Sequence, residues 1–579
     1  MWNAPCRRGA PALEGRMQRF CSRSHAVRVL AALLASAGLP GATAAPQQGA
    51  RAPTLSDADW PGYNRSYAGD RYSSLKQITA ANISRLRSVC TFDAKERVAF
   101  QTGPLVVDGT LYFTTDTNSY AIDAATCALR WKQRTSQPAT YLKANRGLAF
   151  ENGRLFRGTG ATHVMALDAA TGRTLWDVEL AGLPPGTSVP MAPLAWNGMV
   201  FVGNAGGDSY GVTGHVYALD AKDGHTLWRF DVVPDSGPAR ETWRNPNPNV
   251  PPTGGAFWTT FGLDTARGTL FVAAGNPAPD FMPELRPGDN LFTNSVIGLD
   301  AKTGELVGYI QLVKHDFHDW DVDGGPMLIT TRGGKSLVVS ANKDGLLSAI
   351  DRSAARSAIA ATTQLQRRNL AMAGDITRTF ALLYQVPTTT RENMDLRLTM
   401  RGALRFCPGV QGGTEWNGPA FLPSMNLLVV GAVDWCTSLR LVRPDSAIAT
   451  KPGAPWTGAM GQGFGVQDTA AKWQGWITAI DADSGTVRWK HRTSMPQLGA
   501  VTVTASGLVL AGELTGDLLA LDARTGRELW RGRTGNAIGG GVITYGVRGR
   551  QLIAVAAGMN SPTWPVKAET ARIVIFGLP

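Results

Sequence analysis

One short pattern recurs along the chain and constrains its fold more than any other feature. In each copy an apolar segment ends in Asp, a turn with Gly follows, and the next segment carries Trp. Gly suits a turn position with a positive φ, so the pattern predicts a β-hairpin. The clearest copies are residues 166–176, 218–228, 479–489 and 520–530. Weaker copies carry Asp123 with Trp131, Asp300 with Gly304, and Asp351 alone.

The spacing of these copies indicates a large repeat. Three intervals between their Asp residues are about 45 to 52 residues long (123 to 168, 168 to 220, 300 to 351), and a hairpin repeated at such a period is typical of propeller blades. Longer intervals, 220 to 300 and 351 to 481, leave room for insertions or degenerate blades. We count seven copies and predict an all-β fold, an eight-bladed β-propeller with tryptophan-docking repeats. The repeated Trp residues are expected to pack between neighbouring sheets rather than to catalyse.

Residues 1–45 have the features of a secretory signal peptide. A short apolar run, residues 27–37, follows several Arg residues, and small residues at 41–45 come at cleavage spacing. The run is too short to span a bilayer. Because the charged leader is long, Met17 is an alternative start. With no other long apolar segment, we expect an exported, periplasmic chain without a transmembrane segment, in which residues 46–579 form a single propeller domain.

Charge and cysteine content narrow the possible functions. The net charge of +12 is spread along the chain without a basic cluster, so nucleic acid is not an expected partner. An acidic protein or a bacterial envelope surface remains open. Outside the leader there are four Cys, which we pair as 90 with 127 and 407 with 436. Buried free thiols are the alternative. No Cys-x-x-Cys-His occurs, so no c-type haem is expected on this chain.

Three N-terminal stretches give the repeats a more specific meaning. Residues 59–65 (Asp-Trp-Pro-Gly-Tyr-Asn-Arg), 71–78 and 101–112, together with the Trp repeats, resemble the quinoprotein alcohol dehydrogenases of the soluble haem-free type. The similarity covers essentially the whole mature chain, and residues 477–560 match well. The resemblance implies an eight-bladed propeller that holds pyrroloquinoline quinone (PQQ) and one metal ion on its central axis. Members of this family also close a loop of similar length to that between Cys407 and Cys436.

The resemblance assigns a set of residues to the quinone. Arg146 would bind quinone carboxylates, because a planar guanidinium can hold a carboxylate through two bonds. Trp258 would form a flat floor, and Lys343 would hydrogen-bond a quinone oxygen. Taken alone, each has an ordinary alternative: a solvated Arg, a core Trp and an exposed turn Lys. The implied cofactor-binding residues are Gln101, Arg146, Gly206, Gly207, Trp258, Lys343, Trp416 and Asn417.

Two departures from the family pattern concern the cofactor pocket. Thr140-Tyr141 stand where the family typically has two adjacent Cys, so the vicinal disulfide that covers the cofactor there is absent. Pro190 replaces a hydroxyl residue common in the cofactor pocket, which removes one expected polar contact.

Residues 315–324 contain the densest cluster of ionisable groups in the chain. Carboxylates this close repel one another unless a cation gathers them, which indicates a metal. The resemblance implies that Asp321 is the general base that takes the alcohol proton. Asp323, two residues further, would face the same side of an extended segment. His315 and His318 are expected to have supporting or structural roles.

The implied metal ligands are Asp208, Asn276, Asp321 and Asp323. Asn276 offers a neutral oxygen of the kind that hard cations accept. Asp208 stands where the family has Glu, so its arm is shorter; the alternative is a turn carboxylate that caps its own loop. An Asp at the position of Asp323 is typical of the lanthanide-using branch, and clustered carboxylates favour a trivalent ion. We therefore expect a lanthanide, with Ca²⁺ as the alternative.

Together these features predict an oxidoreductase. It would oxidise a small-molecule or polymeric alcohol by hydride transfer to metal-polarised PQQ and pass electrons to a separate acceptor such as a cytochrome c. The alternative is a non-catalytic propeller scaffold of the outer-membrane assembly type, which shares the Trp repeats. A scaffold has no functional need for the residues that the resemblance places on the central axis. These axial residues are Arg146, Asp208, Trp258, Asn276, Asp321 and Lys343. The substrate is not predicted, because pocket shape depends on insertions such as residues 352–405.

Overall fold

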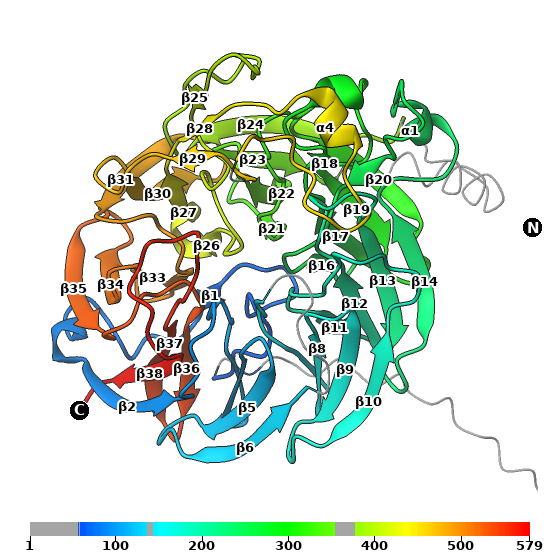
Figure 1. Ribbon diagram of the computed structural model, residues 1–579. Helices are drawn as coiled ribbons and strands as arrows, with labels where there is room; N and C mark the ends of the chain where they lie inside the picture. The colour runs from blue at the N-terminus through cyan, green and yellow to red at the C-terminus, as the bar shows by residue number, and fades with distance from the viewer. Residues whose placement is uncertain (1–55, 57, 136–142, 354–376, 462) are drawn as a thin grey trace, which may run out of the picture. The chain divides into compact units, whose positions relative to one another are not determined.

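The computed structural model describes residues 56, 58–135, 143–353, 377–461 and 463–579. The predicted signal peptide and Thr140-Tyr141 lie outside the described residues. Strands dominate the described part of the chain, which confirms the prediction of an all-β fold. Within residues 54–579, eight sheets of four or five strands surround a common centre (Figure 1). Neighbouring strands pair antiparallel in seven of these sheets; the eighth also contains the parallel pair of β1 with β32.

The first four sheets along the chain are formed by strands that follow one another closely. They are β3 (Leu105–Val107), β4 (Thr110–Thr114), β5 (Asn118–Asp123) and β6 (Leu129–Arg134); β7 (Ala149–Glu151), β8 (Arg154–Gly158), β9 (His163–Asp168) and β10 (Thr174–Glu179); β11 (Leu194–Trp196), β12 (Met199–Gly203), β13 (His215–Asp220) and β14 (Thr226–Asp231); and β16 (Gly262–Asp264), β17 (Thr269–Ala273), β19 (Ser295–Asp300) and β20 (Leu306–Gln311).

The other four sheets complete the ring, and the last of them joins the two ends of the described chain. They are β21 (Met327–Thr330), β22 (Ser336–Ala341), β23 (Leu346–Asp351) and β24 (Ala381–Pro387); β26 (Ala420–Leu422), β27 (Leu427–Asp434), β30 (Gln474–Asp481) and β31 (Val487–Thr493); β1 (Tyr72–Ser73) with β32 (Val501–Thr504), β33 (Leu508–Gly512), β34 (Asp517–Asp522) and β35 (Glu528–Arg533); and β2 (Arg87–Asp93) with β36 (Val542–Val547), β37 (Arg550–Ala557) and β38 (Arg572–Gly577). Figure 1 shows blue β2 beside red β38, with which it pairs antiparallel.

Smaller elements connect the sheets. Two small sheets contain β15 (Thr253–Gly254) with β18 (Pro277–Ala278), and β25 (Leu404–Phe406) with β28 (Thr437–Leu439) and β29 (Val466–Gln467). The described helices are short: α1 (Pro238–Glu241), α4 (Pro444–Ile448) and the 3₁₀ turns Ile83–Arg85, Pro283–Leu285 and Pro423–Met425. Within the described ranges, none of them is long and apolar enough to cross a membrane.

The Asp–Gly–Trp hairpins form as predicted, and four of the Trp residues contact a hairpin of the next sheet. In the hairpin of β9 and β10, the Asp168 carboxylate accepts the Thr171 N–H at 2.9 Å, and Gly172 has φ 74°. A Cβ on Gly172 would lie 2.6 Å from the Trp131 ring, so Trp131 packs on a position that only Gly allows. Its Nε1 also donates to Ala169 O at 3.0 Å. The same pairing of Trp with a later Gly and a carbonyl recurs for Trp176 with Gly224 and Ala221, Trp228 with Gly304 and Ala301, and Trp489 with Gly526 and Ala523.

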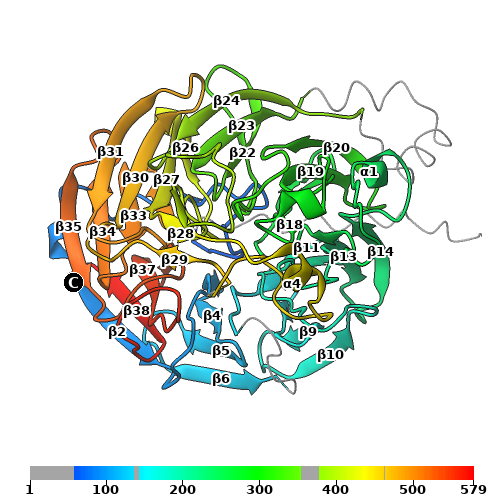
Figure 2. The same ribbon diagram turned by 45° about the horizontal axis from the view of Figure 1, so that its top comes forward.

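Both predicted disulfides are present. Cys90 in β2 bonds Cys127 in the turn between β5 and β6, so it links two neighbouring sheets. Cys407, just after β25, bonds Cys436, just before β28. The second bridge therefore fixes the small β25–β28–β29 sheet, which appears with α4 near the front of the ring in Figure 2.

An apolar cluster packs this small sheet and α4 against the segments that carry the predicted site. Its members include Phe406 of β25, Leu439 of β28, Ala447 of α4, and Trp320 from the acidic segment. Trp456 joins them, and its backbone N–H donates to Asp208 O at 2.6 Å while its Nε1 donates to Ala447 O at 2.8 Å. The insertions between strands thus hold the loops of the site in place.

Candidate functional site

The predicted axial residues converge on one cavity of about 610 Å³. They come from loops of different sheets, so only the folded ring brings them together. The predicted residues that line the cavity are Gln101, Arg146, Gly206, Gly207, Asp208, Trp258, Asn276, Asp321, Lys343 and Trp416.

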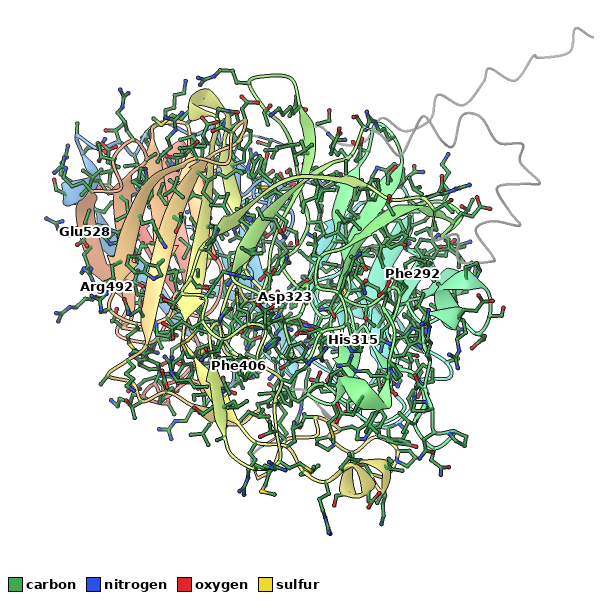
Figure 3. All side chains as sticks on the ribbon, turned by 90° about the horizontal axis from the view of Figure 1, so that it is seen from above. Phe292, His315, Asp323, Phe406, Arg492 and Glu528 are labelled. Atoms are coloured by element: carbon green, nitrogen blue, oxygen red, sulfur yellow. A yellow bond between two sulfur atoms is a disulfide. The ribbon has the colours of Figure 1, made fainter. Side chains whose placement is uncertain are left out.

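Two predicted residues, Asn417 and Asp323, are not among the described residues that line the cavity. The amide of Asn417 serves the fold instead: its Oδ1 accepts the Tyr63 hydroxyl at 3.0 Å, and its Nδ2 donates to Leu498 O at 2.8 Å. Asp323 is buried, and both of its carboxylate oxygens lack a hydrogen-bond partner. Figure 3 shows Asp323 in the interior of the ring, whereas Arg492 and Glu528 lie at its periphery. Asn417 thus lies behind the cavity wall and Asp323 beside the site.

At one end of the cavity, a cation lies between two aromatic rings. The guanidinium of Arg146 is 4.7 Å from the ring centre of Trp258 and 5.2 Å from that of Trp416. Arg146 Nη1 donates to Trp258 O at 3.0 Å, while its Nε has no partner. Burial lowers the pKa of Arg146 to about 10. Gln101 Oε1 is also buried without a partner. Flat rings with a free N–H and a free amide oxygen fit a planar, anionic, polar group such as PQQ.

Next to these rings, Lys343 and Asp321 form a buried ion pair. The Lys343 Nζ lies 2.8 Å from Asp321 Oδ2, and the Asn276 N–H donates to Asp321 Oδ1 at 2.9 Å. A Cβ on Gly275 would overlap with that same oxygen, so Gly is needed for Asp321 to approach. Burial opposes the charge of Lys343, but the surrounding carboxylates outweigh it and raise the pKa of this amine well above its ordinary value. The pair and the Asn276 N–H therefore fix the Asp321 carboxylate beside the cavity.

Two residues of the cavity lining, Asp208 and Asp319, belong to a group of carboxylates that the sequence indicated only in part. Ligand atoms of Asp208, Asp280 and Asp319 all lie within 4.8 Å of one another. Burial, and then the charge of Asp321, raises the pKa of Asp208 to about 6. Burial likewise raises the pKa values of Asp280 and Asp319 well above their usual range, and neighbouring carboxylates add to the effect. Such a group fits a hard cation.

Three carboxylates of this region, Asp319, Asp280 and Glu415, were not predicted as site residues. Asp319 belongs to the acidic segment 315–324, whose density was a signal, whereas Asp280 has none beyond its closeness to Asn276. Glu415 also lines the cavity, and burial raises its pKa to about 7. It precedes Trp416 in a loop expected to face the channel, which was a weak signal.

The two histidines of the acidic segment have structural contacts, as expected. The His318 ring stacks on Trp320 with centroids 3.9 Å apart and planes 13° apart. A His315 ring nitrogen lies 2.8 Å from Gly288 O. Pro190 carries a backbone contact, because its carbonyl accepts the Arg146 N–H at 2.8 Å.

Known proteins resemble this chain over most of its length. The chain matches the family described as "PQQ: Glucose/ethanol/alcohol dehydrogenase, beta-propeller domain" over residues 60–357 and 360–553. Quinoprotein alcohol dehydrogenase PedH of Pseudomonas putida is 29% identical over 542 residues, which cover 86% of each chain. The lanthanide-dependent methanol dehydrogenase of Methylacidiphilum fumariolicum is 28% identical over 580 residues, 93% of this chain and 91% of that relative.

Solved structures show the same fold. A europium-containing methanol dehydrogenase has a TM-score of 0.75 at 25% identity, covering 90% of this chain and 98% of that chain. Because the family match spans most of the chain, the chain belongs to the β-propeller family of PQQ-dependent alcohol dehydrogenases.

Proposed function

We propose that this quinoprotein oxidises a small-molecule or polymeric alcohol in the periplasm and passes the electrons to a separate acceptor such as a cytochrome c. The observation that carries the proposal is the buried pair of Asp321 and Lys343 beside the rings of Trp258 and Trp416 in one cavity. A general base must lie within reach of the proton it takes, and Asp321 lines the same cavity that the alcohol would enter.

Each residue has a distinct task in this proposal. Bound PQQ supplies the electron acceptor that takes a hydride from the alcohol carbon, and a metal ion supplies Lewis acidity. Asp321 accepts the hydroxyl proton of the alcohol, while Lys343 and the Asn276 N–H orient its two oxygens. Arg146 binds carboxylate, and Trp258 provides a flat wall. Gly206 and Gly207 carry no side chain and so leave room for the ligand.

The metal is proposed to be a lanthanide, with Ca²⁺ as the alternative. Asp208, Asn276 and Asp321 line the cavity and offer hard oxygen atoms, and Asp323 adds a buried carboxylate beside them. Lys343 alone does not offset so many carboxylates, which favours a trivalent ion.

We further infer that the eight sheets are the blades of one eight-bladed propeller over residues 46–579. The contacts of Trp131, Trp176, Trp228 and Trp489 with the next hairpins support tryptophan docking as what holds the blades together. We also propose that residues 1–45 are a signal peptide that directs export to the periplasm. A non-catalytic scaffold is disfavoured, since it would not need to bury Arg146, Asp321 and Lys343 around a cavity.

Reconstitution tests the function directly. Purified protein, stripped of metal and quinone, is loaded with PQQ and either Ca²⁺ or La³⁺, and reduction of an artificial dye is followed across a panel of alcohols. We expect turnover with at least one metal. Asp321→Asn should bind PQQ, seen by its absorbance, yet lose about 10²–10⁴-fold in rate, because an amide cannot accept the proton. Asp344→Asn is the matched control: Asp344 is a buried carboxylate next to Lys343 and is not among the described residues lining the cavity. Parent-like turnover by Asp321→Asn would refute the role of this base.

A further inference from the structure

Three carboxylates from separate segments, two buried and one partly buried, meet at a single point. Asp208 follows β12, Asp280 follows β18, and Asp319 belongs to the segment between β20 and β21. Their ligand atoms lie within 4.8 Å of one another. Oxygen atoms that share one ion at about 2.3–2.6 Å can be at most about 5 Å apart. The three carboxylates therefore have the spacing of ligands to a single hard cation.

A second observation indicates that these carboxylates bind a ligand. Asp280 has no exposed surface, and neither of its carboxylate oxygens has a hydrogen-bond partner. Oδ2 of Asp319, which is 1% exposed, also lacks a hydrogen bond. Leaving buried polar atoms unpaired is costly, and native proteins avoid it unless a ligand satisfies them. The free oxygens thus mark an unmet requirement for a positive partner.

A neighbouring carboxylate shows that burial alone does not explain the free oxygens. Asp316 is equally buried and lies in the same acidic segment as Asp319. Its Oδ1 accepts the His318 N–H at 3.0 Å, and its Oδ2 accepts the Trp320 N–H at 2.9 Å. The fold therefore satisfies a carboxylate that it uses for structure, and it leaves Asp280 unsatisfied.

Two cations lie in reach, but neither donates a hydrogen bond to the free oxygens of Asp280 or Asp319. Arg286 contacts the backbone and not the carboxylate of Asp280: its Nη2 donates to Asp280 O at 2.9 Å and its Nε to Pro279 O at 3.1 Å. Lys343 Nζ is 2.8 Å from Asp321 but 3.9 Å from Asp319. Arg286 thereby fixes the backbone of Asp280 while leaving its carboxylate without a hydrogen bond.

We propose that Asp280 and Asp319 bind the catalytic metal together with Asp208, and that this carboxylate trio selects a trivalent lanthanide over Ca²⁺. The proposal rests on the proposed function, because the metal is the one that assists the quinone. Asp208 and Asp319 line the cavity and Asp280 does not, so the ion would enter through the cavity and settle on Asp280. Asp321 is held by Lys343 and the Asn276 N–H at the edge of this trio. Asp323, which lies outside the trio, would then not decide the choice of metal.

Terbium(III) is a suitable probe, because nearby indole rings can sensitise its luminescence. Trp320 follows Asp319 directly, and Trp456 contacts the Asp208 carbonyl. Metal-free, quinone-free full-length protein is titrated with Tb³⁺, and bound Tb³⁺ is then displaced with La³⁺ or Ca²⁺. We expect one Tb³⁺ per chain, displaced far more readily by La³⁺. Asp280→Asn and Asp319→Asn should each weaken Tb³⁺ binding by about 10–100-fold or more and reduce the preference for La³⁺.

Asp323→Asn is the control for charge, since it removes one buried, unpaired carboxylate outside the trio. It should weaken Tb³⁺ binding by less than either trio variant. The luminescence lifetime in H₂O and D₂O adds a structural readout, because a lost protein ligand is replaced by water on the ion. If Asp280→Asn does not fold, Asp319→Asn carries the same comparison.

The outcomes separate this proposal from the function itself. Parent-like Tb³⁺ affinity and hydration in both trio variants, or an equal loss in Asp323→Asn, would overturn the trio as the metal site. Quinone binding and dye reduction by the parent protein are measured in parallel. If the parent binds Tb³⁺ through Asp280 but neither binds PQQ nor turns over, the proposed function fails while the metal site stands.

Discussion

Asp344 offers a sharp test of the electrostatics inferred for the interior. Its side chain is buried beside Lys343, and burial raises the pKa of this carboxyl from 3.8 to about 7. The Leu346 N–H, which donates to its Oδ1 at 3.0 Å, and the charge of Arg391 oppose that rise without cancelling it. Asp344→Asn keeps an oxygen for the Leu346 N–H and removes the need to bury a negative charge. We therefore expect this substitution to stabilise the protein at neutral and alkaline pH.

The size and pH dependence follow from linkage. Between about pH 4 and pH 7 the folded state of the parent binds more protons than the unfolded state, so its free energy of unfolding falls as the pH rises through this window. The difference between 3.8 and about 7 corresponds to on the order of 4 kcal/mol, at about 1.36 kcal/mol per pH unit. Asp344→Asn should therefore match the parent near pH 4, become progressively more stable than it, and reach its full advantage above about pH 7.

Urea denaturation of parent and variant from pH 4.5 to pH 8.5 measures this difference. Asp316→Asn is a control for which the opposite effect on stability is expected. Burial alone would raise the pKa of Asp316, but the hydrogen bond and charge of His318 and the charge of Arg286 lower it overall. The stabilisation from Asp316 is present above its unfolded pKa and lost as the pH falls, so its Asn variant should be destabilised most at neutral pH. A constant difference between Asp344→Asn and the parent at all pH values would refute the reasoning.

Three other substitutions probe the fold and the site. Replacing Cys407 and Cys436 by Ser should lower the free energy of unfolding by about 2–4 kcal/mol, measured by non-reducing denaturation, and an unchanged midpoint would contradict this. Gly275→Ala places a methyl group against Asp321 Oδ1 and should reduce turnover by about 10²-fold with PQQ still bound; full turnover would show that Asp321 tolerates displacement. Arg146→Lys loses the planar fork, so PQQ affinity, followed by quenching of Trp fluorescence, should fall by about 10-fold or more; equal affinity would argue against two-bond carboxylate binding.

The repeat was predictable from the sequence because its determinants are local. Asp168 caps its own turn and Gly172 supplies the positive φ, and both are readable without a partner. The copy at Asp351 looked incomplete because it has no Trp. In the structure Tyr384 takes that place: it packs on Gly485 and its hydroxyl donates to Ala482 O at 2.7 Å. Tyr resembles Trp in having a flat ring and a hydrogen-bond donor, so a pattern that requires Trp does not detect it.

Most of the cavity residues could be predicted from the sequence, because they stand at positions that match the motifs of the family. Asp321 and Lys343 were predicted separately, and their 2.8 Å ion pair joins them. Asn417 was predicted beside Trp416 because neighbours in sequence share a loop, but its amide points to Tyr63 and backbone carbonyls. The sequence did not indicate Asp280 as a site residue. What distinguishes this Asp is that the fold buries its carboxylate without a hydrogen-bond partner, and the sequence alone does not show that.

The free oxygens of Asp280 and Asp319 connect the metal to the stability of the whole ring. Folding buries these carboxylates whether or not an ion is bound. Without an ion, their burial costs free energy, and the cost is larger when the carboxylates are deprotonated. A cation that binds the folded state and not the unfolded chain offsets this cost. Insertions pack Trp320 and Trp456 around the trio, so its geometry is set by the apolar cluster before any ion arrives. The fold therefore buries uncompensated negative charge near its centre. An ion with a higher positive charge offsets more of that charge and stabilises the folded state more.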